Sequence, residues 1–335
     1  MASDLFNDLL VTTLSHIQPT LYSNIMKATP FMRFMFERGR MVTVKSGTKI
    51  EAILASSENQ NVGWTTMGAI LPTSRNAVLT RASYDWKYMD CTVTIYNDEI
   101  SMNRTPEGIL NLLKAELEVQ ETSCKNTMAS SLFSNGSNPL QIGGLQQLIA
   151  DNPATGVVGN IDRATNSWWR NKSIALSESP TADELKAAMN QMVLWCSIDT
   201  DRPGIIVMDE NYYALYESTL QTIQRIVSSN KGDSGYQSID FKGIPVIYDS
   251  NCPANHAYFV NDKYLKMAVG DDGNFKLQPA RQPVNQLAYV YILHFRGNMI
   301  LTNSDRQGVI FSAAETKRNN ELPLNEPKII GKKAA

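Results

Sequence analysis

Residues 241–269 read FKGIPVIYDSNCPANHAYFVNDKYLKMAV. The pattern predicts two short strands, because an apolar run at 244–248 follows a turn at Gly243 and a second run at 257–260 follows the polar corner 249–255. Pro253 and the asparagines of the corner favour a tight turn over one continuous strand. This region is therefore predicted to form two short strands joined by a tight corner.

The preceding half of the chain predicts a long hairpin. Residues 41–57 and 78–96 are rich in strand-forming side chains, whereas the intervening segment 58–77 is polar and contains Asn, Gly and Pro. Together they predict a two-stranded arm with an exposed tip. A two-stranded ribbon is marginally stable alone in water, so a ribbon of this length implies that something else covers it.

Three helices are predicted from apolar periodicity and capping. The longest spans 105–133, with Thr105 as N-cap and Pro106 at the first helical position. One face carries a stripe that predicts packing on a sheet: Ile109, Leu113, Leu117, Cys124, Met128 and Leu132. A second helix spans 181–197 and begins with the capping box Thr181/Glu184, and a third spans 210–228.

The remaining segments are shorter or irregular. Residues 4–40 predict an extended or partly helical arm whose cluster Phe31–Phe36 packs either on its own body or on a neighbouring subunit. Buried strands are expected at 205–208 and in two or three runs within 284–312. Trp168 and Trp169 are expected to anchor the irregular segment 140–175, and a polar tail follows Ala314.

Composition restricts the possible function classes. The chain has 335 residues, 43% of them hydrophobic and 19% charged, with a net charge of −2. Such a balance predicts no strong attraction to nucleic acid or to anionic membranes, although both ends carry a small positive excess. The low charge suits a surface buried against copies of the same chain, or simply a polar uncharged surface. No secretory signal and no membrane-spanning run of 18 apolar residues is visible.

The sequence predicts no catalytic, cofactor-binding or metal-binding residues. His16, His256 and His294 are far apart and lack an acid at ligand spacing, and the triplet Asp271–Gly273 is expected to be a solvated turn. No phosphate-binding glycine loop or nucleophile elbow occurs. An enzyme whose site is assembled from distant residues remains an alternative.

The four cysteines are widely spaced in the sequence. Cys91, Cys124, Cys196 and Cys252 form no closely spaced pair, so free, reduced and mostly buried thiols are expected.

Several motifs resemble tailed-bacteriophage major capsid proteins. They are the G-x-P-V strand at 243–246, the following corner that ends at Pro253, and the run GNIDRATNSWWRN at 159–171. The order of arm, hairpin, long helix and mixed region also matches that family over roughly residues 1–315. The resemblance implies an α+β phage capsid fold.

In that fold, the resemblance assigns each part of the chain a place. Residues 1–41 would be the N-terminal arm and 42–95 the extended loop hairpin. Residues 96–139 and 281–314 would form the peripheral domain around the spine helix, and 140–280 the mixed α/β axial domain. A C-terminal tail, 315–335, would follow.

The resemblance also implies a structural, non-enzymatic function. The chain would self-assemble into hexamers and pentamers of an icosahedral shell that encloses packaged double-stranded DNA, as part of a virion assembled in the bacterial host cytoplasm. Because the chain starts at the arm, scaffolding is expected from a separate protein. A portal and a decoration protein are further expected partners. Contact with DNA is expected to be weak and non-specific, and no contact with a membrane is expected. The alternatives are an encapsulin-like nanocompartment shell protein and a soluble α/β enzyme.

Overall fold

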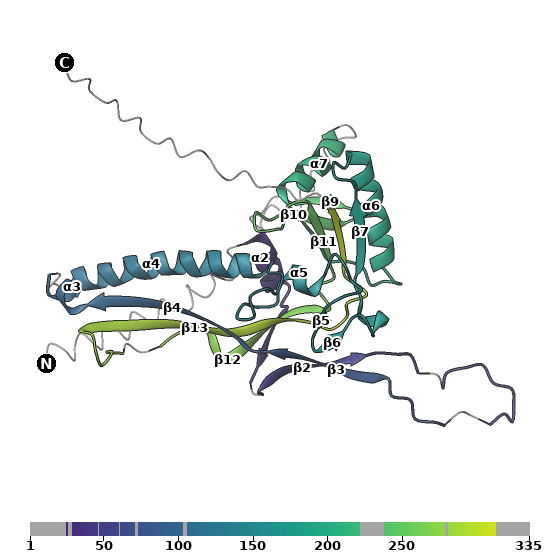
Figure 1. Ribbon diagram of the computed structural model, residues 1–335, viewed down its shortest axis with the longest axis horizontal. Coiled ribbons are helices and arrows are strands. Elements are labelled where there is room, and N and C mark those ends of the chain that lie inside the picture. The colour runs from purple at the N-terminus through teal and green to yellow at the C-terminus, as the bar shows by residue number, and fades with distance from the viewer. Residues whose placement is uncertain are drawn as a thin grey trace, which may run out of the picture.

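The computed structural model describes residues 25, 29–45, 47–59, 61–70, 73–102, 106–221, 238–278 and 281–312. Within them, two sheets and one projecting hairpin account for most strands. Figure 1 shows the long helix α4 lying along the first sheet, the second sheet with its helices at the upper right, and the hairpin extending away from both.

The first sheet has four strands in the order β1-β12-β13-β4 and carries α4 along its length. Its central pair, β12 with β13, is antiparallel and contains bulges between Val269 and Lys276. The expected solvated turn at 271–273 is therefore wrong, since these residues lie within a bulged strand. The bounds are β1 Met41–Val44, β12 Leu265–Leu277, β13 Ala288–Leu301, β4 Lys87–Tyr96, α3 Asn97–Met102 and α4 Pro106–Ser131.

The second sheet has six strands in the order β7-β14-β11-β8-β10-β9. The two strands predicted within 241–269 are both present, but β8 lies between them, parallel to β10 and antiparallel to β11. Helices α6 and α7 complete this domain. The bounds are β7 Lys172–Leu176, α6 Ala182–Cys196, β8 Ile205–Met208, α7 Glu210–Gln221, β9 Ser238–Phe241, β10 Ile244–Tyr248, β11 His256–Val260 and β14 Gly308–Ser312.

Local signals explain where the helices start. The Thr181 hydroxyl accepts the N–H of Glu184 at 3.2 Å, as the capping box predicts. Asp209 caps α7 by accepting the N–H of Tyr212 at 3.1 Å. It also accepts the N–H of Asn255 at 2.8 Å, so one carboxylate holds both the helix start and the corner before β11. The expected extension of α7 beyond Gln221 lies outside the described residues.

The aromatic cluster near the N-terminus belongs to the main core of its own subunit. Helix α2, Pro30–Glu37, starts at Thr29, whose hydroxyl accepts the N–H of Met32 at 3.3 Å. Phe31, Met32, Phe34 and Met35 are all buried, and the Phe31 ring lies 6.0 Å from that of Phe133. Of the two expected locations for this cluster, the structure shows packing on its own body. The first 24 residues of the expected arm lie outside the described residues.

The segment after α4 is irregular but firmly anchored. It contains α5 (Leu145–Leu148), β5 (Val157–Val158), β6 (Ile161–Asp162) and the short helix η1 (Ser167–Trp169). Trp169 is buried and donates its indole N–H to the carbonyl of Val158 at 3.0 Å, which confirms the expected anchoring. Arg163 is also buried and donates to the carbonyls of Leu148 and Trp169 and to the Ser304 hydroxyl, so one guanidinium connects α5, η1 and the segment between β13 and β14.

Cys91 and Cys124 form a disulfide, so the expectation of free thiols is wrong for this pair. Strand β4 and helix α4 lie against each other, which brings the two Cα atoms to 6.6 Å although 33 residues separate them in sequence. The error arises because sequence spacing reveals local cysteine pairs only. Cys196 and Cys252 are buried thiols outside any disulfide, as expected.

The sheet partners divide the chain differently from the expected ranges. Only β2 (Lys49–Ala55) and β3 (Leu79–Asp85) pair as a hairpin, because β1 and β4 join the four-stranded sheet. β12 was expected in the axial range 140–280 but lies in the sheet under α4. β14 was expected in the peripheral range 281–314 but lies between β7 and β11. Pairing between strands this far apart in sequence leaves no local signal.

Candidate intersubunit surfaces

The β2–β3 hairpin projects from the body and has two different faces. Side chains of β2 alternate strictly, with Ile50, Ala52 and Leu54 buried and Ile53 exposed. The buried face packs on the main core of the same subunit. The opposite face, together with the loop beyond it, contacts no other part of the described chain that would bury its apolar side chains (Figure 1). The ribbon is thus covered by its own subunit on one side only.

Tyr84 fixes the root of this hairpin. Its hydroxyl donates to the carbonyl of Leu301 at 2.8 Å and accepts the N–H of the same residue at 3.2 Å. Burial is the main cause that raises the pKa of Tyr84, so the phenol stays protonated and able to donate. Gly159 has a φ of +61°, and a Cβ there would lie 2.9 Å from the Tyr84 ring, which explains why glycine occupies the position.

Further polar contacts hold the root from the other strand and from the sheet. The Asn298 amide donates to the carbonyl of Asp85 at 2.8 Å and accepts the N–H of Gly143 at 2.9 Å. The Trp86 indole donates to the carbonyl of Gly47 at 2.9 Å, and the Arg296 guanidinium lies 4.2 Å from the Trp86 ring centre. The direction in which the hairpin projects is therefore set by several independent contacts.

The hairpin tip presents large apolar side chains to solvent. Asn61 donates to the carbonyl of Ser74, and Asn76 donates to the Asn59 side chain at 3.3 Å, so polar bonds join the two sides of the loop. Beyond these bonds, Trp64 and Met67 are each as exposed as in an extended chain. The apolar tip comprises Val62, Trp64, Met67 and Ile70. Exposed apolar side chains grouped in this way mark a site of protein association.

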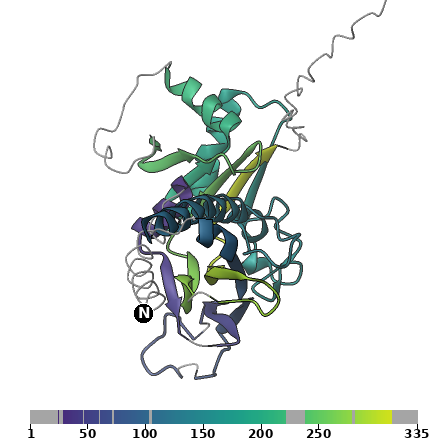
Figure 2. The same ribbon diagram turned by 90° about the vertical axis from the view of Figure 1, so that its left-hand side faces the viewer.

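Two other regions also expose apolar side chains. The end of α6 and the turn after it expose Leu194, Trp195 and Ile198. Helix α3 lies at the end of the four-stranded sheet farthest from the hairpin (Figure 1). Met102 of α3 is exposed, as are Val284 and Leu287 in the segment before β13. Figure 2, turned by 90°, shows the domain that carries α6 above α4 and the hairpin below it. The three apolar regions therefore lie on different parts of the molecule and would face different neighbours.

A polar cleft of about 240 Å³ lies at the hairpin root. Its lining includes Lys49, whose ammonium lies 3.2 Å from the carboxylate of Asp85, and Lys87, which donates to the carbonyl of Pro139 at 2.5 Å. The charged groups of the cleft are thus used in contacts within the subunit. We assign the cleft to hairpin positioning rather than to chemistry.

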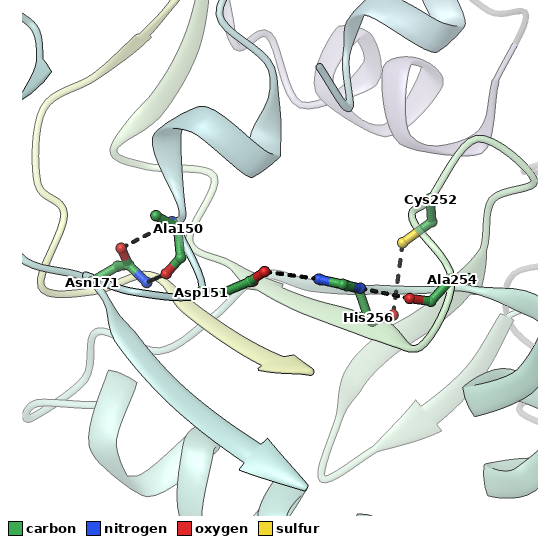
Figure 3. A network of polar contacts seen from close by, with 6 residues as sticks. All are labelled: Ala150, Asp151, Asn171, Cys252, Ala254 and His256. Carbon is green, nitrogen blue, oxygen red and sulfur yellow. Dashed lines mark hydrogen bonds and ion pairs between the residues drawn. The ribbon is translucent and has the colours of Figure 1, made fainter. Parts of the chain in front are cut away.

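The structure gives two of the three histidines an acidic partner that sequence spacing concealed. His256 Nε2 lies 3.1 Å from Asp151, and its Nδ1 lies 2.7 Å from the carbonyl of Ala254 (Figure 3). His294 contacts Asp90 across the β13–β4 pair. His16 lies outside the described residues. Among the residues that the structure describes, no three His, Cys, Asp or Glu side chains converge as a metal site would require.

The His256 contacts link two parts of the chain. Asn171 exchanges hydrogen bonds with the backbone of Ala150, which positions the adjacent Asp151 in front of the imidazole (Figure 3). Burial lowers the pKa of His256, but the hydrogen bonds to Asp151 and Ala254 and the charges of Asp151 and Asp209 outweigh it, so the pKa is raised overall. Both ring nitrogens face acceptors, and only the protonated ring donates to both.

Sequence reasoning did not single out Tyr84, Arg163 or Asn298. Their roles depend on contacts with residues between 141 and 217 positions away. The run 159–171 is unusual for its two tryptophans. The structure shows that Arg163 within it is also buried and connects separate segments of the chain. Burial lowers the pKa of Arg163 to about 10, which leaves the guanidinium charged at neutral pH.

Comparison with known proteins identifies the fold. No protein-family model and no curated protein matches the sequence. Among solved structures, the cyanophage A-1(L) capsid asymmetric unit matches with a TM-score of 0.61 and 19% identity, over 82% of this chain and 90% of that chain.

Two further capsid structures match over similar shares. The capsid of the empty GTA particle gives a TM-score of 0.56 at 11% identity, over 83% of this chain and 89% of its own. A structure of Mycobacterium phage Bobi gives a TM-score of 0.51 at 11% identity, over 83% of this chain and 90% of that chain. At such identities the similarity establishes the fold. The chain has the α+β phage capsid fold, which confirms the predicted fold class.

Proposed function

We propose that this chain is a major capsid protein of a tailed phage, a structural subunit that self-assembles into an icosahedral shell around double-stranded DNA. The observation that carries the proposal is the capsid fold shared over more than four-fifths of the chain. The exposed tip supports it independently. The described residues of one subunit leave Trp64, Met67 and Ile70 exposed, whereas a neighbouring subunit would supply the missing surface.

The geometry favours contacts of the head-to-tail type. A projecting hairpin and the body that receives it are different surfaces, so each subunit gives one and accepts another. Contacts of this kind close into rings when the rotation between subunits fits, and hexamers and pentamers are the rings that an icosahedral shell needs. Burying the tip on a neighbour makes assembly and stabilisation the same process.

The strand pairing suggests a revised assignment of the parts. The extended loop would be residues 49–85. The peripheral domain would be α4 with the four-stranded sheet, and the axial domain the six-stranded sheet with α6 and α7. The proposed arm within 1–41 and the tail 315–335 fall largely or wholly outside the described residues.

The remaining partners belong to the same proposal. A separate scaffolding protein, a portal and a decoration protein would act with the shell, which would be assembled in the host cytoplasm and become part of the virion. DNA contact would be weak and non-specific, and no enzymatic activity is proposed. In the described part of the chain, no helix has the length and apolarity needed to cross a bilayer.

The test compares the wild-type chain with the variant Trp64→Ser/Met67→Ser/Ile70→Ser, with and without a co-expressed scaffolding protein. These side chains are exposed among the described residues of the subunit, so the variant should keep the wild-type melting temperature. Wild-type protein should sediment as shells and the variant as small oligomers or free subunits. Normal shells formed by the variant would contradict the proposed role of the tip in assembly.

The contents of the particles distinguish a phage capsid from a nanocompartment shell. Shells that retain DNA support the capsid proposal, whereas shells that enclose only protein cargo would point to a nanocompartment. A wild-type chain that stays monomeric or dimeric under every condition would favour a soluble enzyme.

A further inference from the structure

Helix α4 is held unevenly along its length. Among its described side chains, only Leu117 and Glu121 are buried before Cys124. From Cys124 onwards the helix joins the main core through Met128, followed by Leu132 just beyond its end. Among the helix residues whose side chains are described, the main core therefore begins at Cys124.

Fewer side chains are buried on the other side of this boundary. A gap of only about 10 Å³ lies between the helix and the sheet, lined by Cys91, Val93, Leu117, Gln120, Glu121, Tyr291 and Leu293. Glu121 forms an ion pair with Lys125 on the same helix, at 2.6 Å. Leu117 is thus the one apolar side chain within the described residues 114–123 that is buried on the strands below.

The disulfide stands at this boundary. Cys124 is bonded to Cys91 on β4, and both residues are almost fully buried. The bond therefore attaches the helix to the sheet at the point where continuous core packing stops. The other two cysteines are buried and lie outside any disulfide.

We propose that Cys91 and Cys124 form a redox-controlled latch for residues 114–123 of α4. With the thiols reduced, residues 114–123 open from the sheet more often than with the disulfide formed, because the disulfide ties them to β4. This inference concerns the isolated subunit and does not depend on the proposed shell function.

The chemistry requires a small disulfide such as oxidised glutathione. The thiolate of one cysteine attacks it, forming a mixed disulfide and releasing one small thiol. The second cysteine then attacks the mixed disulfide and releases the other small thiol. The protein pair loses two electrons and two protons, and the small disulfide gains both. Because both sulfurs are buried in the closed structure, oxidation and reduction each need the helix to open.

Thiol counting provides the first test. The unassembled full-length chain, equilibrated with oxidised glutathione and then denatured, should show two thiols to an alkylating reagent. After reduction it should show all four of its cysteines. Four reactive thiols before reduction would overturn the proposal.

Hydrogen exchange followed by mass spectrometry provides the second test of the latch. Reduction should accelerate amide exchange in 114–123 by about tenfold or more, which corresponds to about 1.4 kcal/mol of opening free energy, and leave the β11 amides unchanged. The control variant Cys252→Ala should respond like wild type, and Cys91→Ala/Cys124→Ala should not respond to reductant. Equal exchange of oxidised and reduced wild-type protein would contradict the latch without needing any variant to fold.

Discussion

The hydroxyl of Tyr84 on the projecting hairpin both donates to and accepts from the backbone of Leu301, at the end of β13. Residues 217 positions apart thereby set the direction of the hairpin relative to the body. A shell subunit needs such control, since a small change of angle at the root becomes a large displacement at the tip.

We expect Tyr84→Phe to lower the free energy of unfolding by about 1–3 kcal/mol, because it leaves both backbone groups of Leu301 buried without a partner. Urea denaturation measures this loss. Tyr88→Phe provides the control, since Tyr88 is more than half exposed and should change stability little. An equal effect of the two substitutions would show that the Tyr84 hydroxyl does not hold the root.

The long helix offers a test of its buried face. Leu117 is 5% exposed, and Leu117→Asp should cost roughly 3 kcal/mol or more, because a carboxylate would be placed in an apolar site. Val119→Asp on the same helix is the matched control, because Val119 is 65% exposed. Thermal melting should separate the two variants by many degrees. If Leu117→Asp melts with the parent, the assignment of the buried face is incorrect.

The His256 contacts predict a pH dependence of stability. Since the pKa of His256 is raised above 6.5 in the folded chain, the extra stability is fully present below about pH 6.5 and is lost as pH rises through the folded value. The stability difference between wild type and His256→Gln should therefore shrink from about pH 6 to about pH 8. Denaturation curves across this range measure it, and Asp151→Asn should weaken the trend. A difference that does not vary with pH would exclude protonated His256 as the source.

DNA binding by free subunits should be weak. The net charge is −2 and only the chain ends carry a small positive excess, so contact with phosphates should be non-specific and should disappear as salt rises. Fluorescence anisotropy of labelled duplexes of different sequence measures this. Sequence-selective binding, or nanomolar affinity at physiological salt, would contradict a simple lining of the shell.

Locally encoded features were predictable from the sequence, and features assembled from distant residues were not. The capping box at Thr181 and the apolar stripe through Leu117 and Met128 predicted helices that the structure contains. Leu117 and Met128 are buried as expected, while the side chain of Leu113 lies outside the described residues. In each case the signal lies within a single helix.

The features that could not be predicted depend on pairing between residues far apart in the sequence. Nothing near β14 reveals that it joins β7 and β11, and nothing near Asp151 reveals its contact with His256, 105 residues away. The disulfide was missed for the same reason, since Cys91 and Cys124 meet only after α4 lies on β4. The order of elements succeeded where local patterns could not, because it matched a known arrangement as a whole.

Electron microscopy of the expressed chain tests the central claim most directly. The account predicts closed icosahedral shells, alone or with a co-expressed scaffolding protein, in which the density of each 49–85 hairpin lies over an adjacent subunit and covers Trp64. Particles whose hairpin tips remain in solvent, or a preparation that contains only monomers and dimers under all conditions, would contradict it.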